Sequence, residues 1–246
     1  QDIIAGDPER VYAYTCEVVK AVHVPVSVKL SAAVGNLSAV VEAAGKAGAS
    51  GISGIDTLRC ILKIDIESGK PDLPTYGGYS GAPIRPIGLA TIASIAQCTD
   101  LPVIGMGGIE NYENLIEYIM AGASAGGIGT AILLHGYDVV TQTIQHLETW
   151  MQAHSIKSIE EIRGRALPEL YSFEEIKRDM KQVKLIKEQN GASCTKCRKC
   201  IDCCLHNAIS SPEDPEAPIQ IHESLCDGCG LCVSVCPERK LILCRL

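Results

Sequence analysis

The chain has 246 residues, of which 46% are hydrophobic and 21% are charged, and its formal net charge is −7. This composition is typical of a globular protein large enough to bury a core. The charge argues against a nucleic-acid partner, because such proteins carry a basic face. No apolar run reaches the length of about 18 residues that a transmembrane helix needs, so no membrane partner is expected.

Short apolar runs alternate with helical patterns along much of the chain, which is typical of β–α units around a parallel sheet. Asp7 and Asn36 stand where they would cap helices. A long loop rich in Gly and Pro is expected at residues 57–82. The expected helices cover residues 7–22, 36–47, 84–98, 111–121 and 137–154, and the expected strands cover residues 25–30, 50–55, 102–105 and 125–128.

A charged, amphipathic helix is expected at about residues 173–189. It would be a helical linker within residues 171–190 or, alternatively, a docking element. The α/β domain would then occupy residues 1–170, and a cysteine-rich domain would occupy residues 191–246.

Two strands are followed by glycines just ahead of a helix: Gly107 and Gly108 after the third, and Gly129, with Thr130, after the fourth. Such glycines let backbone N–H groups approach a phosphate, as in the loops after the last strands of (β/α)8 barrels. Ordinary βα turns are the alternative. Lys29 ends an otherwise apolar strand, which indicates contact with an anion or an electron-rich ring, unless its side chain reaches solvent instead.

Thirteen Cys residues are present, and ten of them fall between residues 194 and 244. Clustering at short spacings indicates metal in a reducing, cytoplasmic compartment rather than a disulfide scaffold. Two runs read C-x2-C-x2-C-x3-C, the pattern of bacterial two-cluster ferredoxins, in which the fourth Cys of each run serves the other cluster. On this pattern one [4Fe–4S] cluster is held by Cys194, Cys197, Cys200 and Cys236, and the second by Cys204, Cys226, Cys229 and Cys232.

Alternatives stay open at these cysteines. A pair of zinc sites would need two separate C-x2-C pairs each, whereas each run here holds three evenly spaced Cys and a fourth. Cys203, adjacent to Cys204, is an alternative fourth ligand. Cys244 fits neither run and is expected to be an apolar filler.

Five segments follow one another along the chain: PVSVKL, GASGISGIDTL, YGGYSGAPIRPIGL, VIGMGGI and GIGTAIL. Their order and spacing resemble the dihydroorotate dehydrogenase family, and within it the dihydropyrimidine dehydrogenases, which combine an FMN barrel with a two-cluster ferredoxin domain. The resemblance implies an α/β fold, the C-terminal half of a TIM (β/α)8 barrel with four parallel strands, followed by a small α+β ferredoxin domain. Because the chain begins at Gln1 without an initiator Met, an N-terminally truncated fragment is expected.

The resemblance also implies roles for individual residues. Asp56 and Thr57 occupy the positions of a substrate-binding Asn-Thr pair, although ionised Asp only accepts hydrogen bonds. Residues 3–6, where dihydropyrimidine dehydrogenases place their active-site Cys, hold no Cys or Ser, so the catalytic acid or base is expected upstream and stays unassigned. The residues expected to bind FMN are Lys29, at the flavin's pyrimidine edge, Ile55, Gly81, Met106, Gly107, Gly108, Gly129 and Thr130.

Together with the cysteine pattern, the resemblance implies an FMN- and iron–sulfur-dependent oxidoreductase that interconverts a pyrimidine and its 5,6-dihydro form, with electrons relayed through two [4Fe–4S] clusters. No G-x-G-x-x-G follows a strand, so the expected electron partner is an NAD(P)H-oxidising flavoprotein subunit or a ferredoxin. An oligomer is also expected. The alternatives are a dihydroorotate dehydrogenase-type activity with fused clusters and a non-catalytic electron-transfer subunit.

Overall fold

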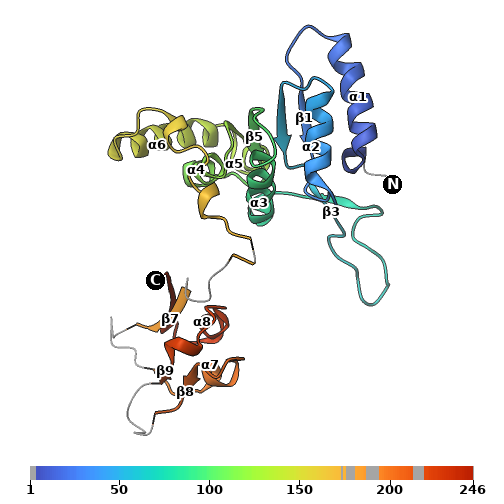
Figure 1. The fold of residues 1–246 in the computed structure, drawn as a ribbon. Helices are drawn as coiled ribbons and strands as arrows, with labels where there is room; N and C mark the ends of the chain where they lie inside the picture. Colours follow the sequence, from blue (N-terminus) through green and yellow to red (C-terminus); the bar gives the residue numbers. More distant parts are fainter. Residues whose placement is uncertain (1–3, 173, 176–180, 187–193, 213–218, 246) are drawn as a thin grey trace. The chain divides into compact units, whose positions relative to one another are not determined.

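The computed structural model describes residues 4–172, 174–175, 181–186, 194–212 and 219–245 (Figure 1). The chain divides into two compact units, Gln1–Leu170 and Tyr171–Leu246. Among the described residues, no helix combines the length and the apolar character needed to cross a membrane.

A parallel sheet forms the centre of the first unit, with its four strands in the order β1-β2-β5-β6. Lys29 in β1 pairs with Ser53 in β2, and Ser53 pairs with Ile104 in β5. Because the strands run in the same direction, their carboxyl ends share one edge of the sheet, the edge at which α/β folds bind ligands. The strands are β1 (Ser27–Leu30), β2 (Gly51–Gly54), β5 (Val103–Met106) and β6 (Ala125–Gly127).

Helices alternate with these strands, which confirms the predicted pattern. Asp7 accepts hydrogen bonds from two N–H groups of the first turn of α1, and Asn36 accepts one from the first turn of α2, so both predicted caps are present. The short helix α5 was not predicted, and it begins at Thr130, directly after the glycine loop. The helices are α1 (Pro8–Ala21), α2 (Leu37–Lys46), α3 (Arg85–Ala96), α4 (Tyr112–Met120), α5 (Thr130–His135) and α6 (Asp138–Ala153).

Apolar side chains between the sheet and the helices form the core of this unit. Leu30 and Ile52 from the sheet are fully buried, as are Val40 from α2 and Ile92 and Ile95 from α3. Burial of such side chains is the main source of stability in a domain of this size. It also holds the strand ends in place, and the loops at the carboxyl edge start from these ends.

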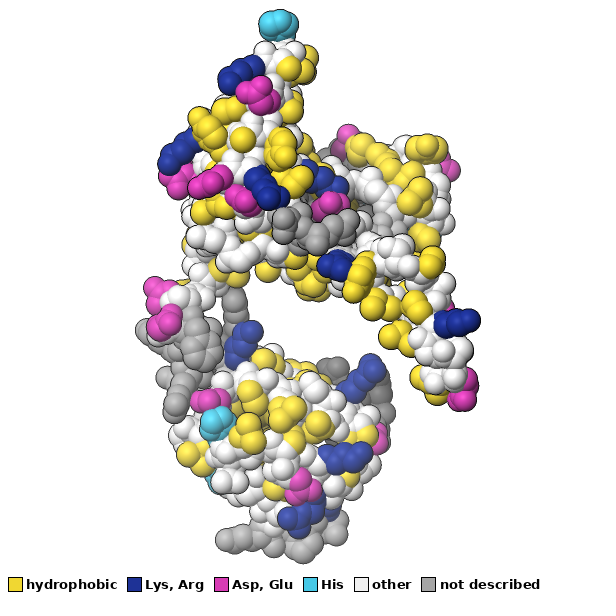
Figure 2. Space-filling model, turned by 90° about the vertical axis from the view of Figure 1, so that its right-hand side faces the viewer, with side chains coloured by type: hydrophobic (Ala, Val, Ile, Leu, Met, Phe, Trp, Pro, Cys, Tyr) yellow, Lys and Arg dark blue, Asp and Glu magenta, His cyan; other side chains and the backbone are white. Residues whose placement is uncertain are grey.

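The loop expected at residues 57–82 contains an antiparallel hairpin made of β3 (Leu58–Cys60) and β4 (Gly77–Tyr79). Figure 1 shows the hairpin loop projecting from the unit, and Figure 2 shows hydrophobic side chains along it. Ile66, within that loop, is 90% exposed. The hairpin was missed because strands of three residues show too little alternation to be recognised.

Among its described residues, the second unit contains two small antiparallel strand pairs and two short helices. β7 pairs with β10, and β8 pairs with β9. The described elements are β7 (Lys181–Leu185), α7 (Lys199–Asp202), β8 (Ile209–Ser210), β9 (Gln220–Ile221), α8 (Leu231–Val235) and β10 (Leu241–Arg245).

The helix predicted at residues 173–189 is wrong over Lys181–Leu185, which forms β7. Val183 is buried in a core with Cys200, Cys232 and Leu241. A short run of charged and apolar residues fits the periodicity of a helix as well as that of a strand. The strand forms because β10, far along the sequence, supplies its hydrogen-bonding partner. Most of the remaining predicted helix lies outside the described residues.

Candidate functional site

A cleft opens at the carboxyl ends of the parallel strands. Its wall brings together the residues for which FMN binding was predicted, together with Thr57 of the predicted substrate pair. Ser80 and Ile84 also line it and were not predicted. The predicted FMN-binding residues that line the cleft are Lys29, Ile55, Gly81, Met106, Gly107, Gly108, Gly129 and Thr130.

The loop after β5 has a backbone shape that favours glycine. Gly107 and Gly108 have φ angles of 118° and 77°. A Cβ on Gly108 would lie 2.6 Å from the carbonyl oxygen of Gly81, so two walls of the cleft approach each other at a distance that only glycine permits. Within the described part of the chain, the N–H groups of Gly107, Gly108 and Gly129 donate to no acceptor. These donors are therefore available to an anion in the cleft.

A hydrogen bond joins two loops of the cleft that lie fifty residues apart. The hydroxyl of Thr130 donates to the hydroxyl of Ser80 at 2.9 Å. This contact places the start of α5 beside the segment that contains Gly81. Ser80 could have been predicted to line the cleft only from its position next to Gly81 in the YGGYSG segment.

Lys29 brings a positive charge to the cleft and forms an ion pair with Asp56. Its Nζ lies 3.3 Å from Asp56 Oδ1, and the two side chains are 50% and 59% exposed. The same oxygen accepts the N–H of Thr57 at 2.8 Å. Lys29 and Thr57 line the cleft, whereas Asp56 lies next to Lys29 but does not line the cleft. The acid at this position therefore partly neutralises the cation.

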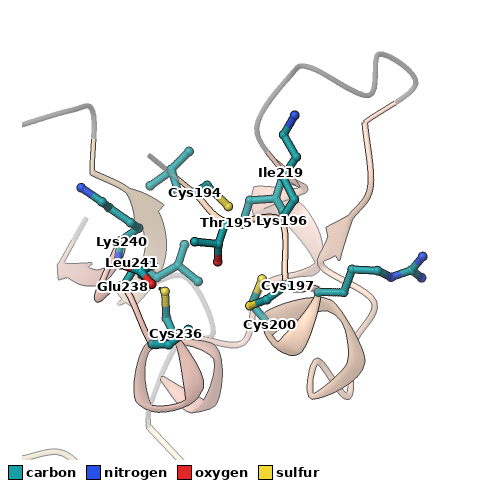
Figure 3. A pocket seen from close by; sticks show the side chains of 13 residues that line it. Cys194, Thr195, Lys196, Cys197, Cys200, Ile219, Cys236, Glu238, Lys240 and Leu241 are labelled. Atoms are coloured by element: carbon teal, nitrogen blue, oxygen red, sulfur yellow. Dashed lines mark hydrogen bonds between the residues drawn. The ribbon is translucent and has the colours of Figure 1, made fainter. Parts of the chain in front are cut away.

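Four thiols of the second unit surround one small cavity. Figure 3 shows Cys194, Cys197, Cys200 and Cys236 around it, three from the first cysteine run and one from the end of the second. In the described part of the chain, no three metal-ligating side chains meet closely enough to hold a single ion. Three thiols from one C-x2-C-x2-C run and a fourth from the other run follow the ligand pattern of a polynuclear cluster rather than that of a zinc site.

The second set of thiols is gathered around Cys232. Burial raises the pKa of the Cys232 thiol to about 11, and repulsion from the thiols of Cys203, Cys229 and Cys226 adds to the rise. These interactions place the three cysteines of the second run close to Cys203. Ligand binding requires the thiolate form, so a metal here must displace protons.

Cys203 and Cys204 differ in their hydrogen bonds. Cys204 Sγ accepts the backbone N–H four residues further on at 3.2 Å, and Cys236 Sγ accepts the equivalent N–H at 3.3 Å. Cys203 Sγ instead donates to the carbonyl of Cys200 at 3.4 Å. Cys204 therefore matches Cys236 in its local geometry, while Cys203 interacts with Cys232.

The second cysteine run packs closely against β7. Gly228 and Gly230 have φ angles of 66° and 76°. A Cβ on Gly228 would overlap the carbonyl oxygen of Lys181. The strand that sequence patterns missed therefore supports this run directly, and glycine is needed where the two backbones meet.

The fold and the two sites define an α/β protein of the barrel class joined to a ferredoxin-like domain. Residues 4–151, more than half of the chain, match the family described as dihydroorotate dehydrogenase. Residues 193–240 match the family described as 4Fe-4S dicluster domain. The chain belongs to the dihydroorotate dehydrogenase family, which confirms the family resemblance and the fold class predicted from sequence.

Curated relatives carry the name "Dihydroorotate dehydrogenase B (NAD(+)), catalytic subunit". The relative from Thermococcus kodakarensis is 39% identical over 165 residues, covering 67% of this chain and 54% of the relative. The relative from Streptococcus pneumoniae strain R6 is 41% identical over 162 residues, covering 65% of this chain and 51% of the relative. The chain spans about half the length of these relatives.

Proposed function

We propose that the protein is an oxidoreductase, dependent on FMN and iron–sulfur clusters, that interconverts a pyrimidine and its 5,6-dihydro form. The observation that carries this proposal is the presence, in one chain, of a glycine-lined cleft beside Lys29 and a cavity surrounded by four thiols. When bound, FMN supplies hydride chemistry. Iron–sulfur clusters carry electrons.

The cleft has features that suit both ends of FMN. The N–H groups of Gly107, Gly108 and Gly129, which have no acceptor among the residues that the structure describes, suit the phosphate. Lys29 would place positive charge at the pyrimidine edge of the flavin. Ile55, which is buried but reaches the cleft wall, would lie against the ring system.

Two [4Fe–4S] clusters fit the cysteine pattern of the second unit. The first would be held by the four thiols around the cavity in Figure 3. The second would be held by Cys226, Cys229, Cys232 and Cys204, because Cys204 has the same N–H···S geometry as Cys236. Each fourth ligand comes from the opposite run, which would tie the two halves of the domain together.

The proposed substrate is a cyclic amide of the pyrimidine type, bound near Thr57. The negative charge of Asp56 disfavours a substrate carboxylate. We therefore place a neutral dihydropyrimidine first. Dihydroorotate, which carries a carboxylate, is the second candidate, and the name of the curated relatives favours it.

The electrons would be exchanged with a separate protein, either an NAD(P)H-oxidising flavoprotein subunit or a ferredoxin. The curated relatives are named as catalytic subunits of an NAD(+)-linked enzyme, which supports a partner of the first kind. The exposed apolar loop between β3 and β4 offers surface for protein contacts, in agreement with an oligomer.

Anaerobic reconstitution of the full chain with FMN, iron and sulfide tests the proposal. We expect one FMN and about eight iron atoms per chain. Lys29→Ala should weaken FMN binding, whereas Lys46→Ala, which removes an exposed lysine of α2 from its ion pair with Glu42, should leave it unchanged. Uptake of iron without flavin would contradict the proposal and favour a non-catalytic electron-transfer subunit.

A further inference from the structure

Tyr118 in α4 is fully buried beneath the glycine loop that follows β5. Its hydroxyl donates to the carbonyl oxygen of Gly107 at 2.7 Å and lies 3.4 Å from that of Met106. Burial raises the pKa of Tyr118 to about 12, so the hydroxyl stays protonated and remains a donor at physiological pH. The side chain thus holds the backbone of the cleft from the core side.

The segments packed against Tyr118 have glycine where the phenol ring lies. A Cβ on Gly105 in β5 would lie 2.5 Å from the Tyr118 ring, and a Cβ on Gly88 in α3 would overlap its hydroxyl. A Cβ on Gly107 would lie 3.4 Å from the same hydroxyl. Gly105 in β5 and Gly88 in α3 therefore make room for one tyrosine, whereas a Cβ on Gly107 would only be in ordinary contact with its hydroxyl.

The position of the Gly107 carbonyl determines where the next N–H points. The carbonyl of Gly107 and the N–H of Gly108 belong to one trans peptide unit, in which the two groups point in opposite directions. Because the oxygen points at Tyr118 in the core, the Gly108 N–H points away from the core. Gly108 lines the cleft, and within the described residues its N–H has no acceptor.

We propose that Tyr118 is a positioning residue that orients the Gly107–Gly108 peptide so that the Gly108 N–H binds the phosphate of FMN. The proposal rests on the proposed FMN site and adds to it a residue that does not touch the cofactor. Without the Tyr118 hydroxyl, this peptide is free to rotate, since glycine permits both orientations. The phosphate would then lose one ordered donor.

The obvious alternative is that the bond only satisfies a buried hydroxyl. The two roles predict different effects on the binding of FMN and of riboflavin. A purely structural role would change the binding of FMN and of riboflavin, which lacks the phosphate, to the same extent. A positioning role would weaken FMN alone.

The test compares FMN and riboflavin binding to the full chain by quenching of flavin fluorescence. Tyr118→Phe should raise the Kd for FMN about tenfold and leave the Kd for riboflavin within about twofold. Tyr112→Phe, at the other end of α4 with its hydroxyl near Glu113 at 3.4 Å, is the matched control and should change neither. Equal weakening of both ligands, or no weakening of FMN, would overturn the proposal.

Two further variants keep the test decisive if Tyr118→Phe fails to fold. Replacing Tyr118 by 4-fluorophenylalanine fills the space of the hydroxyl without a donor and should reproduce the loss. Replacing it by 4-aminophenylalanine restores a donor and should recover FMN affinity. A wild-type chain that binds neither flavin would contradict the proposed function itself, whereas normal FMN preference in the donor-free variant contradicts only the role of Tyr118.

Discussion

The ammonium group of Lys29 lies 3.3 Å from Asp56 Oδ1, at the edge of the proposed flavin cleft. Lys29 comes from β1 and Asp56 follows β2, two strands that pair in parallel. The acid stands where the resemblance to dihydropyrimidine dehydrogenases implies an amide. The pair therefore links the proposed flavin-binding cation to the position proposed to select the substrate.

Asp56→Asn should raise the midpoint potential of bound FMN. The amide keeps the size of the side chain but leaves the charge of Lys29 unpaired, and an unpaired cation stabilises the more negatively charged reduced flavin. An exposed ion pair contributes up to about 1 kcal/mol, which corresponds to about 20 mV for a two-electron couple. Anaerobic titration against redox dyes measures the shift.

Glu42→Gln is the control for this variant, because it breaks an ion pair of similar exposure, that with Lys46 at 2.7 Å, on α2. We expect no change of potential there. An Asp56→Asn potential equal to that of the wild type would show that Asp56 does not modulate the charge of Lys29.

Cys236→Ser should remove one cluster, because Cys236 closes the cavity shared with the first cysteine run. We expect the iron content to fall from about eight to about four atoms per chain. Cys244→Ser, in β10 opposite Gln182, should leave the iron content unchanged. Equal loss of iron in both variants would contradict the ligand assignment.

Separate alanine variants of Cys203 and Cys204 should distinguish the fourth ligand of the second cluster. Cys204→Ala should lose about half of the iron, since Cys204 matches Cys236 in its N–H···S bond. Cys203→Ala should retain both clusters in iron analysis and electron paramagnetic resonance. The reverse pattern would assign the ligand to Cys203, which interacts with Cys232.

The stability of the metal-free chain should fall as the pH rises from about 9 towards 11. Burial raises the pKa of Cys232 to about 11 in the folded state, whereas a thiol in an unfolded chain has a pKa of about 8.5. The folded state therefore keeps a proton that the unfolded state releases, and the stabilisation present at lower pH is lost through this window. Urea unfolding at several pH values measures how steeply the free energy of unfolding falls with pH. Cys232→Ala should make this fall less steep. An equally steep fall in both proteins would show that Cys232 does not cause it.

Much of the first unit was predictable because its signals are local. Asp7 and Asn36 cap helices through contacts within one turn, and glycines mark loops at the carboxyl edge of the sheet. The spacing of the cysteines likewise predicts that the first three thiols of a run lie together, since each run is a local turn. The position of Cys236 beside the first run is not a local signal, and it was predicted from the pattern of two-cluster ferredoxins.

The features that were missed depend on contacts between distant segments. β7 exists because β10 pairs with it. The role of Tyr118 depends on glycines in α3 and β5 that leave space for its ring. In sequence Tyr118 is one apolar position of an amphipathic helix, and nothing local indicates that its hydroxyl reaches Gly107.

We propose that bound FMN passes electrons between a pyrimidine ring and the iron–sulfur clusters of this chain. The most direct test reduces the reconstituted full chain chemically without oxygen and then adds uracil or orotate. We predict that absorbance of the oxidised flavin and clusters returns as the 5,6-dihydro product forms, with uracil more effective than orotate. Flavin and clusters that stay reduced in the presence of both pyrimidines would contradict the account.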